Sequence, residues 1–370
     1  PGMTCPASTT TLSPITSWAP DTSCSVPSAV SRRAVVSVRA ARSVAAYFLH
    51  DDIPPHDFVI MNPPYASTAR DDAFATAATR DLFAYFLERV ATTSRGFIAV
   101  TPASYLGAPK FAGLRLLLDD HLTGGDITVF DNVPDTLFRG YKFGSSNTSK
   151  TNFVRAAVTV CPPDADSWRI TPILRWRAAS RAALLDMAPS LLALRHVGGA
   201  GEWLKIHPDH HDIYAQMRGW QRTIADLVVP GPTEFSLTVA TTPRYYVSAA
   251  FGELSRRSKQ VLHFATAHDR DLAAMTLNSS APYLWWRWHD GGVSLTRRVL
   301  MSVPVPDIEP SLIDDIRASE QTNIVTKLNA GIVNENVKHP FALVQRLNRA
   351  VFGADVDVAA AYAQDLTEVP

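Results

Sequence analysis

Short apolar runs alternate with amphipathic stretches from about residue 46 to residue 165. Residues 58–61 and 97–100 are wholly apolar and residues 127–130 nearly so, which predicts three buried strands. Apolar residues recur every four positions from Phe74 to Val90, which predicts a helix over about 71–92. A helix near 114–120 and a strand near 153–160 complete the pattern. Helices and strands in this order predict an α/β fold built on a partial doubly wound, Rossmann-like sheet.

The pattern changes twice further along the chain. Residues 166–310 are mixed, which predicts an α+β region with a helix over 182–194 that is interrupted at Pro189. After Pro310 the apolar spacing of three and four predicts helices over 312–327, 341–351 and 356–366. We therefore expect an α/β region at 46–165, a mixed region at 166–310 and a helical segment at 311–370.

Residues 1–45 do not show the pattern of a folded domain. They are rich in Ser, Thr, Ala, Val, Pro and Arg, and Asp21 is their only acid. No helical or strand period is sustained there. This predicts a disordered leader or sequence foreign to the domain, and an organelle transit peptide is the alternative.

A rigid polar turn follows the first predicted strand directly. Asn62-Pro63-Pro64-Tyr65 comes after the apolar run at 58–61, and ligands bind at the carboxyl ends of strands in open α/β sheets. The amide oxygen of Asn62 and the carbonyl of Pro63 accept hydrogen bonds from an exocyclic amino group, and Tyr65 offers a ring for stacking. The alternative is a proline turn that only redirects the chain.

This turn resembles motif IV of the amino-group DNA methyltransferases, and the chain is similar to Eco57I-like adenine methylases of restriction-modification systems. The resemblance implies that Asn62, Pro63, Pro64 and Tyr65 are catalytic and hold an adenine that has been flipped from the duplex. It also implies an antiparallel hairpin from the last two strands of the sheet. An aromatic residue at the hairpin loop then packs on the other face of the base, and Phe138 matches that place best.

The resemblance implies S-adenosylmethionine as the cofactor, normally held by a glycine-rich loop after the first strand of the fold. The only glycine before Asn62 is Gly2, so such a loop is not found upstream. Asp51 and Asn62 are the candidate cofactor contacts. The run 198–201 lacks a preceding apolar strand and is a poor substitute. We therefore expect this chain not to bind the cofactor with the affinity of an intact enzyme.

Charge places the predicted DNA contacts in one segment. The 370 residues hold 35 basic and 35 acidic side chains, so duplex DNA must be bound by a local patch. Between residues 244 and 298, eight Lys/Arg stand against four Asp/Glu, with tyrosines and tryptophans interleaved. Residues 236–306 are therefore the predicted recognition surface. Within them the runs 277–280, 283–286, 295–296 and 303–306 resemble the target-recognition region of these methylases, and an aromatic-rich core is the alternative. The predicted DNA-binding residues are Arg244, Arg256, Arg257, Lys259, Arg287, Arg297 and Arg298.

Two further functions stay open at this point. One is a non-catalytic DNA-binding remnant or specificity partner, and the other is an RNA or protein-glutamine methyltransferase. A restriction endonuclease is a candidate partner, and the three cysteines and short apolar runs favour a cytoplasmic protein. Metal ligation by the histidines and aspartates at 207–212 is not expected, because their spacing is that of a solvated turn.

Overall fold

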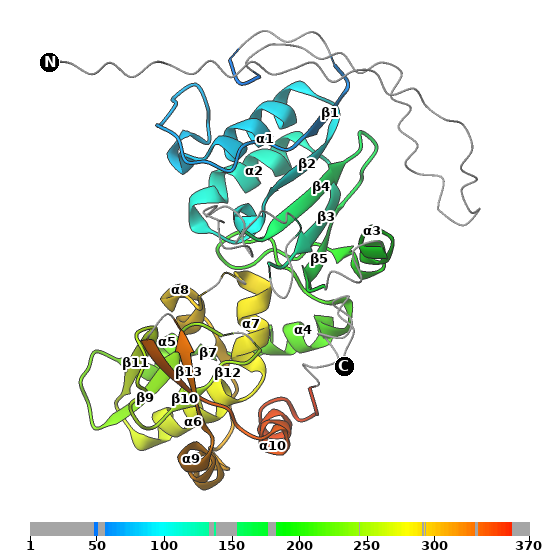
Figure 1. Cartoon of the computed structure of the whole chain (residues 1–370). Coiled ribbons are helices and arrows are strands. Elements are labelled where there is room, and N and C mark those ends of the chain that lie inside the picture. Colours follow the sequence, from blue (N-terminus) through cyan, green and yellow to red (C-terminus); the bar gives the residue numbers. More distant parts are fainter. Residues whose placement is uncertain are drawn as a thin grey trace, which may run out of the picture. The chain divides into compact units, whose positions relative to one another are not determined.

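A six-stranded mixed sheet forms the first part of the chain (Figure 1). The computed structural model describes residues 48–50, 56–132, 137, 154–176, 183–243, 245–290, 292, 294–329 and 332–356, which all lie in the unit formed by residues 47–370. The strand order is β1-β2-β4-β3-β5-β6. The strands are β1 (Phe58–Met61), β2 (Gly96–Pro102), β3 (Gly125–Phe130), β4 (Ala156–Cys161), β5 (Trp168–Leu174) and β6 (Ala193–Leu194).

The pairing within this sheet combines parallel and antiparallel neighbours. β1 runs parallel to β2, and β3 runs parallel to β5. β4 lies between β2 and β3 and is antiparallel to both. The α/β prediction and its first three strands are therefore confirmed, and β3 and β4 form an antiparallel hairpin. The sheet extends beyond residue 165, the expected end of this region, because β5 and β6 join it.

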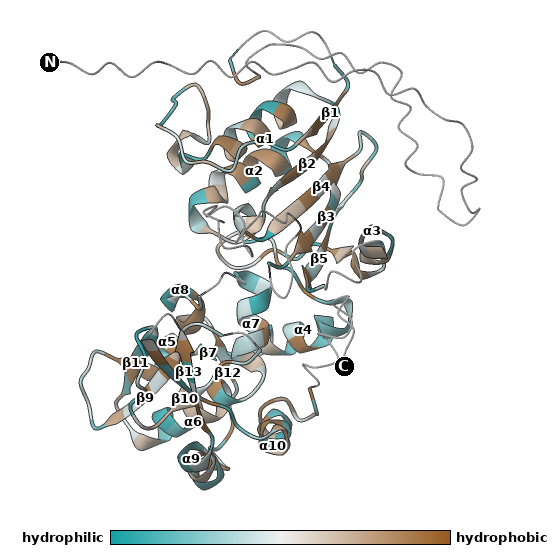
Figure 2. Ribbon diagram, in the orientation of Figure 1, coloured by the Kyte–Doolittle hydropathy of each residue, from teal (hydrophilic) through white to brown (hydrophobic). Residues whose placement is uncertain are grey.

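Two helices cover one side of the sheet: α1 (Leu82–Thr93) and α2 (Ala112–His121) (Figure 1). The apolar face of α1 buries Phe83, Leu87 and Val90 in a core shared with β2 and β3. Figure 2 shows the strands as predominantly hydrophobic and these two helices as mixed in hydropathy. β1 and β6 are the two edge strands of this sheet, and Ile60 on β1 is 67% exposed.

The first helix begins at Leu82, so its predicted start at residue 71 is wrong. Residues 66–82 fold back on themselves instead: Thr68 N donates to Arg80 O at 2.9 Å and Leu82 N donates to Ala66 O at 3.0 Å. Arg80 has a left-handed φ of 53°, which ends a short 3-10 turn and prevents helical continuation. The carboxylate of Glu88 on α1 accepts from the backbone of this fold-back, which holds it against the helix.

Residues 183–229 connect the sheet to a second region. Pro189 ends the helix expected over 182–194, which is short, and Ala193–Leu194 join the sheet as β6. The elements here are α3 (Leu184–Met187), α4 (His211–Gly219), β7 (Arg222–Thr223), α5 (Ile224–Leu227) and β8 (Val228–Val229).

The second region is organised around a four-stranded sheet of order β10-β9-β11-β8. Its neighbouring strands pair antiparallel. Its further strands and helices are β9 (Phe235–Ala240), β10 (Ala249–Ala250), β11 (Lys259–Phe264), α6 (Ala267–Asn278), α7 (Ala281–His289), α8 (Arg297–Met301) and β12 (Pro304–Val305).

The aromatic residues of α7 lie in the core of this region. Tyr283, Trp285, Trp286 and Trp288 are each at most 6% exposed. Two of the buried indoles donate hydrogen bonds: Trp285 Nε1 to Ser302 Oγ at 3.0 Å and Trp286 Nε1 to the Ser294 carbonyl at 3.3 Å. For these four residues the alternative of an aromatic-rich core therefore describes the structure, and they are not part of a DNA-contacting face.

Two buried asparagines explain the segment at 277–280. The Asn278 side chain pairs with both backbone groups of Ala249, accepting from its N–H at 2.9 Å and donating to its carbonyl at 3.0 Å. It thus fastens the end of α6 to β10 as a strand would. Asn348 accepts from Ser280 N at 2.8 Å and donates to Ser280 Oγ at 3.0 Å. These contacts give the Asn-Ser-Ser sequence a structural role.

The wholly helical C-terminal segment is a wrong prediction at residues 324–337. The structure has α9 (Ile313–Thr322), then the antiparallel hairpin of β13 (Ile324–Asn329) and β14 (Ile332–Val337), then α10 (Phe341–Phe352). The β-branched residues Ile324, Val325 and Thr326 favour a strand directly after Asn323. The helix predicted over 356–366 lies outside the described residues apart from Val356.

No helix in the described ranges is long and apolar enough to cross a membrane. Nor do these ranges bring three His, Cys, Asp or Glu side chains together as metal ligands. His207-Pro208-Asp209 forms a turn in which His207 Nδ1 accepts from Asp209 N at 3.2 Å.

His339 provides a test of this core. Its Nε2 lies 3.1 Å from Asn278 Oδ1 and its Nδ1 lies 2.9 Å from Ser319 Oγ. Asn278 Oδ1 already accepts from a backbone N–H, so the pairing fits a neutral imidazole protonated on Nε2. Burial lowers the pKa of His339 from 6.5 to about 4.

We predict that replacing His339 by glutamine makes stability less dependent on pH. Between pH 6.5 and 4 the unfolded chain binds a proton that the folded chain excludes, so this contribution is present above 6.5 and is lost on acidification. The resulting loss of unfolding free energy is on the order of 3 kcal/mol. Thermal unfolding followed from pH 7 to pH 4 measures it, with His121→Gln at an exposed site as the control. Equal pH slopes for wild type and His339→Gln would contradict the assignment.

Candidate functional site

The Asn62–Tyr65 turn lies at the carboxyl edge of the parallel strands. β1 ends at Met61, which pairs with Ala99 of β2, so the turn begins where both strands approach the edge. Asn62 is exposed, Pro63 is buried and Pro64 is exposed. The proline rings fix φ at two successive positions. The side chain of Asn62 is therefore presented to solvent from a backbone that is held in place.

Tyr65 is anchored to the neighbouring strand. Its hydroxyl donates to the carbonyl oxygen of Val100 on β2 at 3.0 Å. Burial raises the pKa of Tyr65 to about 12, so the phenol stays protonated and keeps donating at neutral pH. The ring is thus fixed at the same edge as Asn62.

Asp131 lies at the same edge, directly after β3, and its carboxylate is the meeting point of three guanidinium groups. Arg155 Nε donates to Oδ1 at 2.8 Å. Arg175 Nε and Arg287 Nη1 donate to Oδ2 at 3.1 and 2.8 Å. Arg155 precedes β4, Arg175 follows β5, and Arg287 belongs to α7 of the second region. One carboxylate therefore joins the ends of three strands to a helix.

The electrostatics of this cluster follow from its burial. The Asp131 side chain is inaccessible to solvent, and burial alone raises the pKa of a carboxyl group. The charges of Arg155, Arg287 and Arg175 outweigh that effect and hold the pKa of Asp131 well below its usual range. Asp131 is therefore ionised at neutral pH. Asp131 is not among the residues predicted from the sequence, and its only sequence signal is an acid placed directly after a buried strand.

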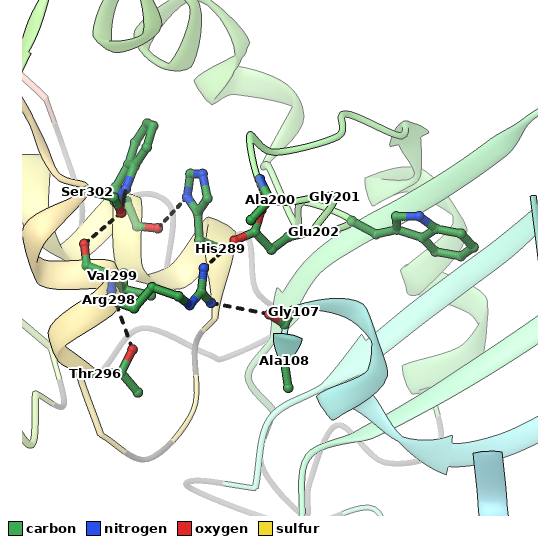
Figure 3. A network of polar contacts seen from close by, with 12 residues as sticks. Gly107, Ala108, Ala200, Gly201, Glu202, His289, Thr296, Arg298, Val299 and Ser302 are labelled. Atoms are coloured by element: carbon green, nitrogen blue, oxygen red, sulfur yellow. Dashed lines mark hydrogen bonds and ion pairs between the residues drawn. The ribbon is translucent and has the colours of Figure 1, made fainter. Parts of the chain in front are cut away.

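A second polar network ties the two regions together (Figure 3). Arg298 of α8 donates through Nη1 to Glu202 Oε1 and through Nη2 to the carbonyl of Gly107 at 3.3 Å. A Cβ at Gly107 would lie 2.4 Å from the carbonyl oxygen of His289, so α7 approaches here closely enough to require glycine. Lys205 is buried beside the network, with Nζ 3.3 Å from the same His289 oxygen, and burial lowers its pKa to about 7.

The glycine run at 198–201 is a closed turn. Gly198 N donates to the Glu202 carbonyl at 2.8 Å, and Ala200 N donates to the Glu202 carboxylate at 3.0 Å. Gly201 has φ +73°, and its carbonyl accepts from Arg115 Nε. The carboxylate of Glu202 therefore takes the backbone N–H of Ala200, and its backbone carbonyl takes that of Gly198.

Several predicted DNA-binding residues have structural partners instead. Arg287 is 8% exposed and is bound to Asp131 and to the carbonyl of Ile173, so its prediction as a surface DNA contact is wrong in this structure. Arg256 donates to three oxygens within the second region, among them the Glu335 carbonyl. Lys259 pairs with Glu253 at 2.8 Å.

The remaining predicted contacts divide into two groups. Arg257 and Arg297 are exposed, and Arg298 is half-buried in the network of Figure 3. Arg244, Phe138 and Asp51 lie outside the described residues. Tyr245, which is 53% exposed, lies over the guanidinium of Arg175 at 4.9 Å.

Comparison with known proteins gives distant structural similarity only. No protein-family model matches the chain, and no curated protein matches it in sequence. It is similar to a nuclease-deletion mutant of the Type ISP restriction-modification enzyme LlaGI in complex with a DNA substrate mimic, with 13% identity and a TM-score of 0.29 over 51% of this chain and 21% of that chain. The ATP-dependent Type ISP restriction-modification enzyme LlaBIII bound to DNA is 13% identical, with a TM-score of 0.29 over 51% of this chain and 15% of that chain. A DrdV–DNA complex is 17% identical, with a TM-score of 0.30 over 50% of this chain and 22% of that chain. The matches span less than a quarter of those chains, so the activities of the whole enzymes are not carried over.

We predict that Asp131→Asn strongly destabilises the protein. The change removes the negative charge that three buried guanidinium groups share, and breaking a buried ion pair from one side costs about 3–5 kcal/mol. Asp126→Asn is the matched control at the other end of β3. Its partner Arg169 is 49% exposed, and an exposed pair contributes about 1 kcal/mol or less. Urea denaturation compares the two variants, and equal losses would contradict the structural role of Asp131.

Proposed function

We propose that this chain holds a target adenine by its exocyclic amino group, as the base-gripping and recognition part of an amino-group DNA methyltransferase. The observation that carries the proposal is the Asn62–Tyr65 turn at the carboxyl edge of β1, with Asn62 exposed and the Tyr65 hydroxyl bound to Val100. Under this proposal duplex DNA is the substrate and a restriction endonuclease is the expected partner.

The chemistry assigned to the turn follows from its donors and acceptors. The amide oxygen of Asn62 accepts a hydrogen bond from the amino group at C6 of adenine, and the ring of Tyr65 stacks on a base that has left the duplex. Accepting from the amino hydrogens directs the nitrogen lone pair away from the purine ring. Fixing a reactive nitrogen in one orientation is a large part of catalysis in a transfer between two bound partners.

The arrangement of strands supports the same proposal. The methyltransferase resemblance implies an antiparallel hairpin after the parallel strands, and β3 and β4 form such a hairpin. Asp131 lies where β3 leaves the sheet, at the edge that also carries the Asn62 turn. The residue expected to face the other side of the base, Phe138, belongs to the connection between these two strands.

The described residues do not fit S-adenosylmethionine. The glycine run at 198–201 follows only the two-residue edge strand β6, and two of its backbone N–H groups, those of Gly198 and Ala200, are bonded to Glu202. The acid assigned to the cofactor, Asp51, lies outside the described residues. A second candidate function, consistent with this closed turn, is a DNA-binding remnant or specificity partner that retains the base grip.

We predict that Asn62→Ala abolishes base flipping with little change in affinity for DNA, because phosphate contacts dominate that affinity. A flipped adenine leaves its thymine unpaired, and permanganate oxidises unpaired thymine. Mapping reactive thymines on genomic fragments therefore needs neither a known target sequence nor the cofactor. Tyr65→Phe keeps the ring and should retain more reactivity than Tyr65→Ala, and Gln321→Ala removes an exposed amide elsewhere as the control. Unchanged reactivity in Asn62→Ala would exclude the base grip.

We also predict that the 370-residue chain shows no micromolar affinity for S-adenosylmethionine. Cofactor sites of this class depend on backbone N–H groups of a glycine loop, and the described loop with that composition is closed by its own glutamate. Isothermal titration calorimetry on the full chain measures the affinity. Micromolar binding would overturn the expectation and favour a complete enzyme, whereas its absence favours either the remnant or a longer chain whose cofactor loop lies upstream.

A further inference from the structure

The hairpin of β13 and β14 extends from the second region and is exposed at its outer end. Every residue from Ile324 to Leu328 is exposed, and Leu328 is 68% exposed. Val333, which pairs with Leu328, is 41% exposed. An antiparallel ribbon with both faces exposed tends to aggregate unless a partner covers it or its polar side chains keep it solvated.

The root of the hairpin is held firmly. Val337 is fully buried with Leu254. Asn336 Oδ1 accepts from Ser248 Oγ at 2.8 Å, and the Glu335 carboxylate accepts from Ser255 N at 2.6 Å. The ribbon is therefore rigid where it leaves the region, so its outer end is presented in a defined direction.

The two faces of the ribbon differ in chemistry. The register places Val325 and Lys327 on one face with Asn336 and Asn334 opposite them. This face carries a positive charge and amide groups but no acid. The other face carries Thr326, Leu328 and, near the root, Glu335, whose carboxylate is already bonded to Ser255 N.

Further positive charge adjoins the root. Glu335 N donates to Ser255 O at 3.0 Å, and Arg256 Nη1 donates to the Glu335 carbonyl at 2.9 Å. The turn at 255–257 therefore lies against the hairpin, and Arg257 in this turn is exposed. A cation on the ribbon and another beside its root complement a polyanion.

We propose that the β13–β14 hairpin is a DNA-binding ribbon whose outer end enters the major groove, with Lys327 directed to the duplex and Arg257 to a flanking phosphate. The inference rests on the proposed function and names the element that carries out recognition. The major groove admits a two-stranded ribbon, and its bases present acceptors for lysine and thymine methyl groups for apolar side chains such as Leu328. The acid-free face and the exposed Arg257 beside the root favour DNA over a protein partner.

The test uses the full chain and fluorescent duplexes of random sequence. Lys327→Gln should weaken binding and lower the slope of log affinity against log salt by about 1. Arg346→Gln removes the same charge from α10 and should leave the slope unchanged. A photo-crosslinking residue at Leu328 should label DNA, whereas the same residue at Phe341, which is 62% exposed, should not.

The outcomes separate this inference from the proposed function. Duplex binding with an unchanged slope for Lys327→Gln and no crosslink from position 328 would overturn the ribbon and leave the base grip intact. A change in solution molar mass on Leu328→Asp, with DNA binding unaffected, would assign the hairpin to a protein contact and also overturn it. A chain that binds no duplex would overturn the proposed function and this inference together.

Discussion

The carboxylate of Asp131 fixes the arrangement on which the rest of this structure depends. Guanidinium groups cannot be buried without an acceptor, and Asp131 provides one to Arg155, Arg175 and Arg287 at once. Because these residues come from the ends of two strands and from α7, their bonds define how the second region meets the carboxyl edge of the sheet. The contact of Gly107 with His289 and the Arg298–Glu202 pair add a second point of attachment. Two separate points of attachment restrain both the rotation of the second region against the sheet and the distance between them.

Several basic residues of the chain serve the packing of the protein rather than its surface. Arg256 and Arg287 lie in a sequence segment whose composition is typical of a DNA-binding surface. In the structure their guanidinium groups instead make hydrogen bonds within the protein. Among the described residues predicted to contact DNA, Arg257 and Arg297 are exposed, and Lys327 is an exposed cation on the hairpin. Under the proposed function, the recognition surface is carried by these three residues on a turn, a helix terminus and a hairpin. A charge count along the sequence does not distinguish these two uses of arginine.

Buried amides stabilise the second region in a comparable way. Asn278 replaces a missing strand partner for Ala249, and Asn348 closes the start of α7 through Ser280. Each unmade hydrogen bond of a buried amide costs about 1–3 kcal/mol, so these residues specify one packing of α6, α7 and α10. The segment at 277–280, which resembles a recognition motif, is thus explained by packing.

The sequence by itself determined the strands at 58–61, 97–100 and 127–130, because a run of apolar residues must be buried whatever its neighbours are. It also determined the rigid turn at Asn62–Tyr65, since proline restricts the backbone locally. Only the tertiary structure decided that Arg287 binds Asp131, 156 residues away, and that the tryptophans of α7 lie inside. The structure also ended the helix expected over 312–327 at Thr322, before a local hairpin at 324–337, and delayed the first helix to Leu82. The positions of Arg287 and of the tryptophans depend on partners distant in sequence, and local spacing carries no information about which distant group will satisfy a buried charge or a backbone amide.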